Sequence, residues 1–282
     1  MTYLEIARRG KTAAWRYGLC FVLGLVLTVV LSVAALLPLM MLHLTPPDLA
    51  QQLQHPGDPA VFFLFTGLSF ALLLVSFAAA IGLMHRKRFM DIVGVWRWRG
   101  MRDGAAVWAL VLVVSTVIDL MLAPKGFAFT ATAKTPVLIA WAVPTLALQT
   151  FAEEFVFRGY VTQGLMLATK RPVIAALLSG LVFGAMHIPN GAPQAASAVV
   201  FGVALALIAI RTRGIAFGYG MHLINNVAGA TVLVSGGDVF KGSAGLFTQT
   251  TPNLMWWDVF VEVVALALVA WRVLSKPAEV SR

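Results

Sequence analysis

Long apolar runs without charged residues recur along the 282-residue chain, and they constrain its fold more than any other feature. A helix rises about 1.5 Å per residue, so roughly 20 apolar residues cross the roughly 30 Å hydrocarbon core of a bilayer. We count eight candidate spans, of which the fifth and sixth are the shortest: 17–42, 60–84, 104–123, 135–157, 172–189, 194–210, 214–234 and 254–273. The sequence therefore predicts an all-α, polytopic helical bundle with about eight transmembrane helices, forming one integral membrane domain over residues 1–282.

The composition agrees with a chain that lies in a lipid bilayer. Apolar residues make up 60% of the sequence and charged residues 12%, with a mean hydropathy of +0.86. An ordinary soluble domain has about 25% charged residues. A soluble fold of this length has too little interior to bury so much apolar surface.

The basic residues alternate between the connecting segments. The net charge is +9, which in a soluble chain would suggest nucleic acid as a partner. Here all but three of the 21 basic residues, the exceptions being Lys125, Lys134 and Lys241, fall on one side of the predicted membrane. Arg158 is counted on that side because of its place in the chain, although it is expected to lie within the membrane. By the positive-inside rule both termini are expected in the cytoplasm. The placement of the charge also means that no nucleic acid is expected as a partner. The compact chain is typical of a bacterial inner membrane protein.

Several features suggest structural roles when taken one at a time. Cys20 is the single cysteine and lies in the first span, so no disulfide framework is expected. That span is too long for a signal peptide and is interpreted as a retained anchor. Glu262 lies alone in the last span and is expected to be structural, whereas Asp119 and His85 are expected at the membrane interface, as is the loop 86–102 with its two tryptophans.

A few polar residues interrupt the apolar spans in the middle of the chain: Glu153, Glu154, Arg158, His187, His222 and Asn226. An ionisable group at the bilayer centre costs roughly 2.5–3.5 kcal/mol on insertion scales. A chain that retains several such groups is expected to use them.

The spacing along the chain predicts that three of these groups reach one depth. Glu153 lies 17 residues before the expected turn at Lys170, and His187 lies 17 residues after it. At about 1.5 Å per residue both are about 25 Å from the turn on antiparallel helices. This requires the helix with Glu153 to continue past residue 158. His222, nine residues beyond Arg213, reaches the same level if the turn at Lys170 protrudes from the lipid.

The spacing within each helix predicts which side chains share a face. Glu154 and Arg158 are four residues apart, in the order that favours an ion pair, whereas Glu153 is about 100° away from Glu154 and is free to face elsewhere. His222 and Asn226 are also four apart, with Asn225 as a weaker candidate for the same role. Phe183 lies one turn before His187 and is expected to wall the site against lipid.

These residue types suit hydrolysis of an amide bond. A glutamate can take a proton from water held by a histidine, while a second histidine and an asparagine donate hydrogen bonds to the oxyanion. The same residues, Glu153, His187 and His222, could instead bind a divalent metal such as zinc that activates the water. The pattern does not choose between these two chemistries.

Three motifs in this order resemble one family of membrane proteins. Glu153–Arg158 has the form EExxxR and is followed by Gly159-Tyr160, Phe183–His187 has the form FxxxH, and His222–Asn226 has the form HxxxN. Over residues 136–235 they resemble the CAAX prenyl protease type 2 family, also called CPBP or Abi proteins. The resemblance implies an intramembrane protease, often labelled a metalloprotease, in which Glu153 and His187 activate water and His222 and Asn226 form the oxyanion site. Glu154 and Arg158 would support them.

Two other functions remain open at this point. The intramembrane acids and imidazoles also suit a transporter or a proton or ion pathway, and the fold also suits a non-catalytic immunity or scaffold protein. The zincin motif HExxH and the rhomboid motif GxSG are absent from the sequence. The expected partner is a membrane-associated peptide or protein, and the bacterial character argues against a prenylated one.

Overall fold

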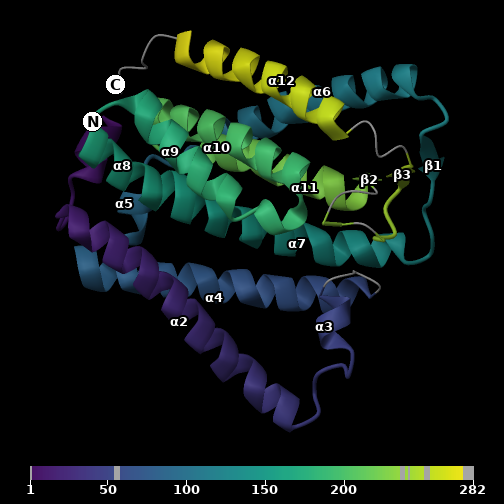
Figure 1. Cartoon of the computed structure of the whole chain (residues 1–282), viewed down its shortest axis with the longest axis horizontal. Coiled ribbons are helices and arrows are strands. Elements are labelled where there is room, and N and C mark those ends of the chain that lie inside the picture. Colours follow the sequence, from purple (N-terminus) through teal and green to yellow (C-terminus); the bar gives the residue numbers. More distant parts are fainter. Residues whose placement is uncertain (1, 54–57, 236–238, 241, 251–254, 276–282) are drawn as a thin grey trace.

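The computed structural model of the protein describes residues 2–53, 58–235, 239–240, 242–250 and 255–275, and in this part of the chain nearly all regular structure is helical (Figure 1). The helices before the motif region are α1 (Tyr3–Ala7), α2 (Ala14–Met41), α3 (Leu49–Gln52), α4 (Pro59–His85), α5 (Phe89–Val93) and α6 (Trp98–Leu122). They are followed by α7 (Thr135–Glu153), the π-helix η1 (Glu154–Val161), α8 (Thr162–Thr169), α9 (Pro172–Ala185), the 3-10 turn η2 (Ile188–Asn190), α10 (Ala192–Thr212), α11 (Ala216–Thr231) and α12 (Met255–Ser275).

Each of the eight expected spans corresponds to a helical segment. Five segments within the described residues are long and apolar enough to cross a membrane: α2, α4, α6, the continuous run 135–169, and α10. Helix α9, with 14 residues, is shorter, as is α11 with 16. The predicted end of the fourth span at residue 157 is wrong, because the helix continues to Thr169 as the depth argument required. The fifth span also ends early, so that His187 lies just beyond α9, and the predicted start of the last span at 254 lies outside the described residues.

Helix boundaries follow from local chemistry. The Asp58 carboxylate accepts hydrogen bonds from the first backbone amides of α4, and Pro59 occupies the first helical position, where its missing N–H is not needed. Lys170 adopts a left-handed conformation with φ of 54°. Pro172 then begins α9, which confirms the turn predicted between these two helices.

Glycines allow the inner helices to approach closely. Gly180 of α9 and Gly202 of α10 face each other, and a Cβ on Gly202 would lie 2.8 Å from the Gly180 Cα. Helices α6 and α11 meet in the same way, since a Cβ on Gly104 or Gly220 would overlap the backbone of the other helix. Small residues at such crossings are typical of membrane helices, which associate through close packing.

The motif-bearing helices lie in the middle of the bundle. Helices α7, α9, α10 and α11 form its centre, with α2 and α4 on one side and α6 and α12 on the other (Figure 1). The outer helices expose apolar side chains, and α2 alone presents Val22, Val26, Val29 and Val33. This apolar outer surface fits an integral membrane protein.

The two ends of the bundle differ. At one end the basic segments meet: Arg9 pairs with Asp91 at 2.6 Å, and Gly94 bridges to Gly214. At the other end three short strands form a sheet in the order β1-β3-β2. They are β1 (Phe127–Phe129), β2 (Leu233–Ser235) and β3 (Phe247–Gln249), with β1 antiparallel and β2 parallel to β3.

Two residues expected at the membrane interface are buried within the protein. His85 is fully buried, because the segment before α2 folds over the end of α4, and its ring contacts the Lys11 carbonyl at 2.6 Å and the Tyr160 hydroxyl at 2.9 Å. Asp119 is only 4% exposed, because α12 covers the end of α6. In the loop 86–102, Trp98 is exposed as expected, whereas Trp96 packs on Phe151.

Candidate active site

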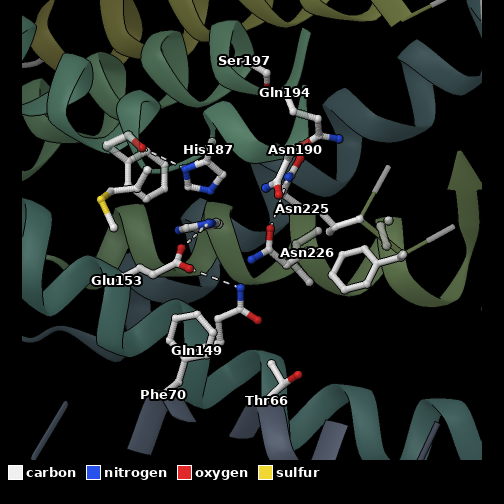
Figure 2. A pocket seen from close by; sticks show the side chains of 18 of the residues that line it. Thr66, Phe70, Gln149, Glu153, His187, Asn190, Gln194, Ser197, Asn225 and Asn226 are labelled. Carbon is white, nitrogen blue, oxygen red and sulfur yellow. Dashed lines mark hydrogen bonds and ion pairs between the residues drawn. The ribbon is translucent and has the colours of Figure 1, made fainter. Parts of the chain in front are cut away.

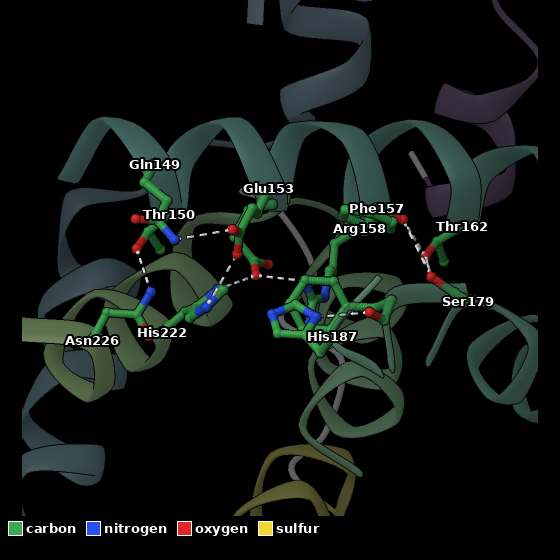
Figure 3. A network of polar contacts seen from close by, with 12 residues as sticks. Gln149, Thr150, Glu153, Phe157, Arg158, Thr162, Ser179, His187, His222 and Asn226 are labelled. Carbon is green, nitrogen blue, oxygen red and sulfur yellow. Dashed lines mark hydrogen bonds and ion pairs between the residues drawn. The ribbon is translucent and has the colours of Figure 1, made fainter. Parts of the chain in front are cut away.

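The two motif glutamates lie at a change of helix type. Helix α7 ends at Glu153, and the π-helix η1 begins at Glu154. In the wider turn the Phe157 carbonyl accepts from the Thr162 N–H, and it also accepts from the hydroxyls of Thr162, at 2.8 Å, and of Ser179 on α9, at 3.3 Å (Figure 3). π-Turns inside α-helices occur frequently at functional sites.

His222 lies between the two glutamates. Its Nδ1 is 2.9 Å from Glu154 Oε1, and its Nε2 is 3.5 Å from Glu153 Oε2. Glu153, which helical periodicity left free to face elsewhere, thus reaches the same imidazole as Glu154. A protonated His222 could donate a hydrogen bond to each side.

Glu154 also pairs with Arg158, as the spacing predicted. Arg158 Nη1 lies 3.1 Å from Glu154 Oε1, and both side chains are fully buried. The contact is an ion pair without hydrogen-bond geometry, since no guanidinium nitrogen has a hydrogen-bond partner among the described residues. The guanidinium carbon also stacks 4.1 Å above the Phe183 ring. Arg158 therefore supplies a fixed positive charge behind the two carboxylates.

His187 presents one ring nitrogen to the cavity. Its Nδ1 lies 2.9 Å from the carbonyl oxygen of Phe183. Because a carbonyl only accepts, Nδ1 carries the proton, and in a neutral ring Nε2 is left as an acceptor. The Phe183 ring contacts that of His187 with centroids 4.5 Å apart and, at 2% exposure, walls the site as expected.

The asparagines of α11 differ in their contacts. Asn226 donates to the Thr150 hydroxyl at 3.3 Å, which leaves its second N–H without that partner. Asn225 accepts from the Trp108 indole at 3.0 Å, and its amide nitrogen reaches Asn226 Oδ1 at 3.5 Å. Asn226 therefore keeps one amide N–H outside these contacts, and Asn225 links Asn226 to Trp108.

One polar residue that contacts a motif glutamate was missed in the sequence. Gln149 donates from Nε2 to Glu153 Oε1 at 3.2 Å (Figure 2). It lies one turn before Glu153 on the same helix face, a spacing that brings side chains into contact. That spacing was the signal that could have found it.

All of these groups open onto one cavity of about 940 Å³. Its polar end is formed by Gln149, Glu153, His187, His222, Asn225 and Asn226 (Figure 2). The rest is largely apolar and comes mainly from α2, α4, α6 and the end of α11 with the residues that follow it, while the start of α10 adds the polar Gln194 and Ser197. A concave apolar site with a few convergent polar groups is typical of a ligand-binding pocket.

The metal ligands proposed from the sequence are not arranged as such. In the part of the chain that the structure describes, no three His, Cys, Asp or Glu side chains are grouped to hold a metal ion. In addition, His222 directs each ring nitrogen toward a carboxylate. Glu153, His187 and His222 are therefore not grouped as a metal site within the described residues.

Comparison with known proteins agrees with the motifs. Residues 135–228 match the family model described as type II CAAX prenyl endopeptidase Rce1-like, which confirms the resemblance over that segment. The chain is also 25% identical over 279 residues to the uncharacterized protein YyaK of Bacillus subtilis (strain 168), with 93% of each chain covered. No solved structure matches the chain. At the level of the family, the match supports a CAAX-type intramembrane protease.

Proposed function

We propose that this protein is an intramembrane endopeptidase that hydrolyses a peptide bond of a membrane-associated peptide or protein. The observation that carries the proposal is the convergence of Glu153, His187 and His222, from three separate segments, on one cavity within a membrane bundle. The positive-inside pattern favours the bacterial plasma membrane, with both termini in the cytoplasm.

Glu153 is the proposed general base. Gln149 holds its Oε1, so Oε2 remains directed toward His222 and the cavity. A water between Glu153 and His187 Nε2 would donate one hydrogen to each, and its oxygen would attack the substrate carbonyl. Glu153 takes the water proton in this step. It then returns the proton to the leaving amine as the C–N bond breaks.

His222 and Asn226 are the proposed oxyanion donors. The two donors would be the second N–H of Asn226, which the contact with Thr150 does not use, and the Nε2–H of a protonated His222, which faces Glu153 Oε2 at 3.5 Å and so lies beside the proposed general base. Glu154 stabilises the charge on His222, and Arg158 balances Glu154. Donors fixed before the reaction stabilise the developing charge without reorganisation.

The test compares purified wild type with Glu153→Gln and His187→Ala on a library of membrane-anchored peptides, with and without a chelator. We expect each variant to lose about 10²–10⁴-fold in kcat, the usual contribution of a general base. Asp103→Asn, which removes an exposed carboxylate outside the cavity, is the matched control and should cleave like the wild type.

Equal cleavage by all four proteins would remove Glu153 and His187 from the mechanism. Cleavage that is abolished by the chelator and restored by a metal would favour the metal-dependent chemistry. Uptake of ions or solutes into liposomes without peptidase activity would favour a transporter. A phenotype unchanged by Glu153→Ala would favour an immunity or scaffold role.

A further inference from the structure

A second cavity, of about 220 Å³, lies beside the catalytic one at the sheet end of the bundle. It is enclosed by α6, α10, α11, α12 and the strands β2 and β3, and the side chains that line it include three carboxylic acids, Asp119, Asp258 and Glu262. Its lining contains no Lys or Arg among the described residues. Glu262, expected to be alone, thus shares a cavity with two other acids.

The three acids come from two helices. Asp119 belongs to α6 and Asp258 to α12, and their carboxyls lie within hydrogen-bond reach of each other. Glu262 is one turn after Asp258, beside the Ser197 hydroxyl of α10. Two carboxylates in contact either share a proton or require a cation between them.

Polar atoms in this cavity lack partners. Asp119 is 4% exposed and Gln249 of β3 is 5% exposed, and both line the cavity. Asp119 Oδ1 and Asp258 Oδ1 are buried without a hydrogen-bond donor of good geometry among the described protein groups, and the nearby Gln249 amide lies close to Asp258. Buried polar atoms are nearly always hydrogen-bonded. The missing partner must donate hydrogen bonds to the carboxylates.

The size and donor set select the class of ligand. The cavity has room for several non-hydrogen atoms, since one water occupies about 30 Å³. The described residues offer no arrangement of three metal-binding side chains. An ammonium group donates three hydrogen bonds and carries the positive charge that adjacent carboxylates require.

The acidic cavity adjoins the catalytic one. Six residues line both cavities: Leu112, Thr116, Gln194, Ser197, Asn225 and Leu233. Asn225 also contacts Asn226, the proposed oxyanion donor. A peptide held at Glu153 could therefore extend a neighbouring residue into the acidic cavity.

We propose that the cavity of Asp119, Asp258 and Glu262 is a substrate subsite that binds an ammonium group near the cleaved bond. The inference rests on the proposed function and adds a substrate class, namely peptides with a lysine or a free N-terminus at that position. The subsite excludes neutral and acidic residues by leaving its carboxylates unpaired.

The experiment measures cleavage of three peptide series that differ only in the ammonium. The first carries lysine at successive positions around the cleaved bond with an acetylated N-terminus, the second carries norleucine with a free N-terminus, and the third carries norleucine with an acetylated N-terminus. At one position we expect the wild type to prefer one ammonium-bearing series over the third by about tenfold or more in kcat/KM. Comparison of the first two series identifies the source of the ammonium.

Asp119→Asn/Asp258→Asn should bring that ratio close to one, whereas Asp258→Asn alone, which keeps Asp119 and Glu262, should lower the ratio by a smaller factor. Asp103→Asn should keep the wild-type ratio. An unchanged ratio in folded variants, or a wild type without preference, overturns the subsite. If the wild type cleaves none of the peptides, the proposed function fails instead. Binding of the same peptides to Glu153→Gln, with the same preference expected, then tests the cavity by itself.

Discussion

His222 Nδ1 lies 2.9 Å from Glu154 Oε1, and this contact joins the third motif of the sequence to the first. Both side chains are buried, with exposed fractions of 6% and 0%. The neighbouring carboxylate of Glu153 approaches the other ring nitrogen. One imidazole thus contacts both acids.

Replacing one partner of the ion pair of Glu154 and Arg158 is expected to destabilise the protein more than replacing both partners. Arg158→Met should destabilise the protein by about 3–5 kcal/mol, because it leaves a buried carboxylate without its counter-charge. The double variant Glu154→Gln/Arg158→Met should lose less than the sum of the single variants. Thermal unfolding in detergent checks this, and strictly additive losses would contradict the coupling.

Gln149→Leu is expected to lower kcat about tenfold with little change in KM. The amide of Gln149 orients Glu153 Oε1, so its loss frees the general base to rotate, and positioning errors reduce rate more than binding. Gln51→Leu, on exposed helix α3, is the matched control. Equal kcat values for wild type and Gln149→Leu would remove Gln149 from the site.

Gly218→Ala should reduce activity by several-fold without unfolding the protein. A Cβ at this position would lie 3.3 Å from Glu154 Oε2, so the carboxylate must shift away from His222. Gly18→Ala in α2 meets nothing within 4 Å and should be neutral or slightly stabilising, since alanine favours helix. Steady-state kinetics of both variants decide, and full activity in Gly218→Ala would argue against a tightly held Glu154.

The stability of the basic end should depend on pH through Lys87. Burial lowers the pKa of Lys87 to about 8, with Asp91 acting in the opposite direction, and its ammonium donates to Ala7, Tyr17 and Gln163. Between this value and the usual pKa near 10.5, the unfolded chain holds a proton that the folded protein has lost. Lys87 therefore makes stability rise with pH in that window, by at most about 1.4 kcal/mol per pH unit.

The test compares the free energies of unfolding of the wild type and Lys87→Met between pH 7 and 10. Other groups titrate in the same range, and their contributions cancel in the difference between the two proteins. We expect the wild type to gain stability relative to the variant above pH 8, and no change in the difference below it. A difference that is constant across the range would show that Lys87 stays protonated in the folded protein.

Much of the architecture could be predicted from the sequence. Apolar runs and the placement of basic residues marked the eight helical segments, because a membrane requires long apolar helices and each polar interruption is costly. Equal spacing from the turn at Lys170 predicted that Glu153 and His187 lie at one depth, and both line one cavity. Helical periodicity predicted the ion pair of Glu154 and Arg158.

Other features depended on contacts between distant segments. Regular α-helical geometry would place Glu153 and Glu154 about 100° apart around the helix. The sequence did not predict the π-helix η1, in which the Phe157 carbonyl accepts hydrogen bonds from the Thr162 and Ser179 hydroxyls. Asp119, His85 and Glu262 each suggested an ordinary role from local sequence. Their surroundings differ because segments far along the chain cover them.

The sequence by itself determined which segments enter the membrane and which side chains carry charge there, since these follow from the cost of placing each residue in hydrocarbon. Only the tertiary structure decided that one histidine reaches both glutamates and that Asp119 meets Asp258 across two helices. Helix periodicity fixes the direction of a side chain on its own helix. The partner that it meets depends on how the helices pack against one another.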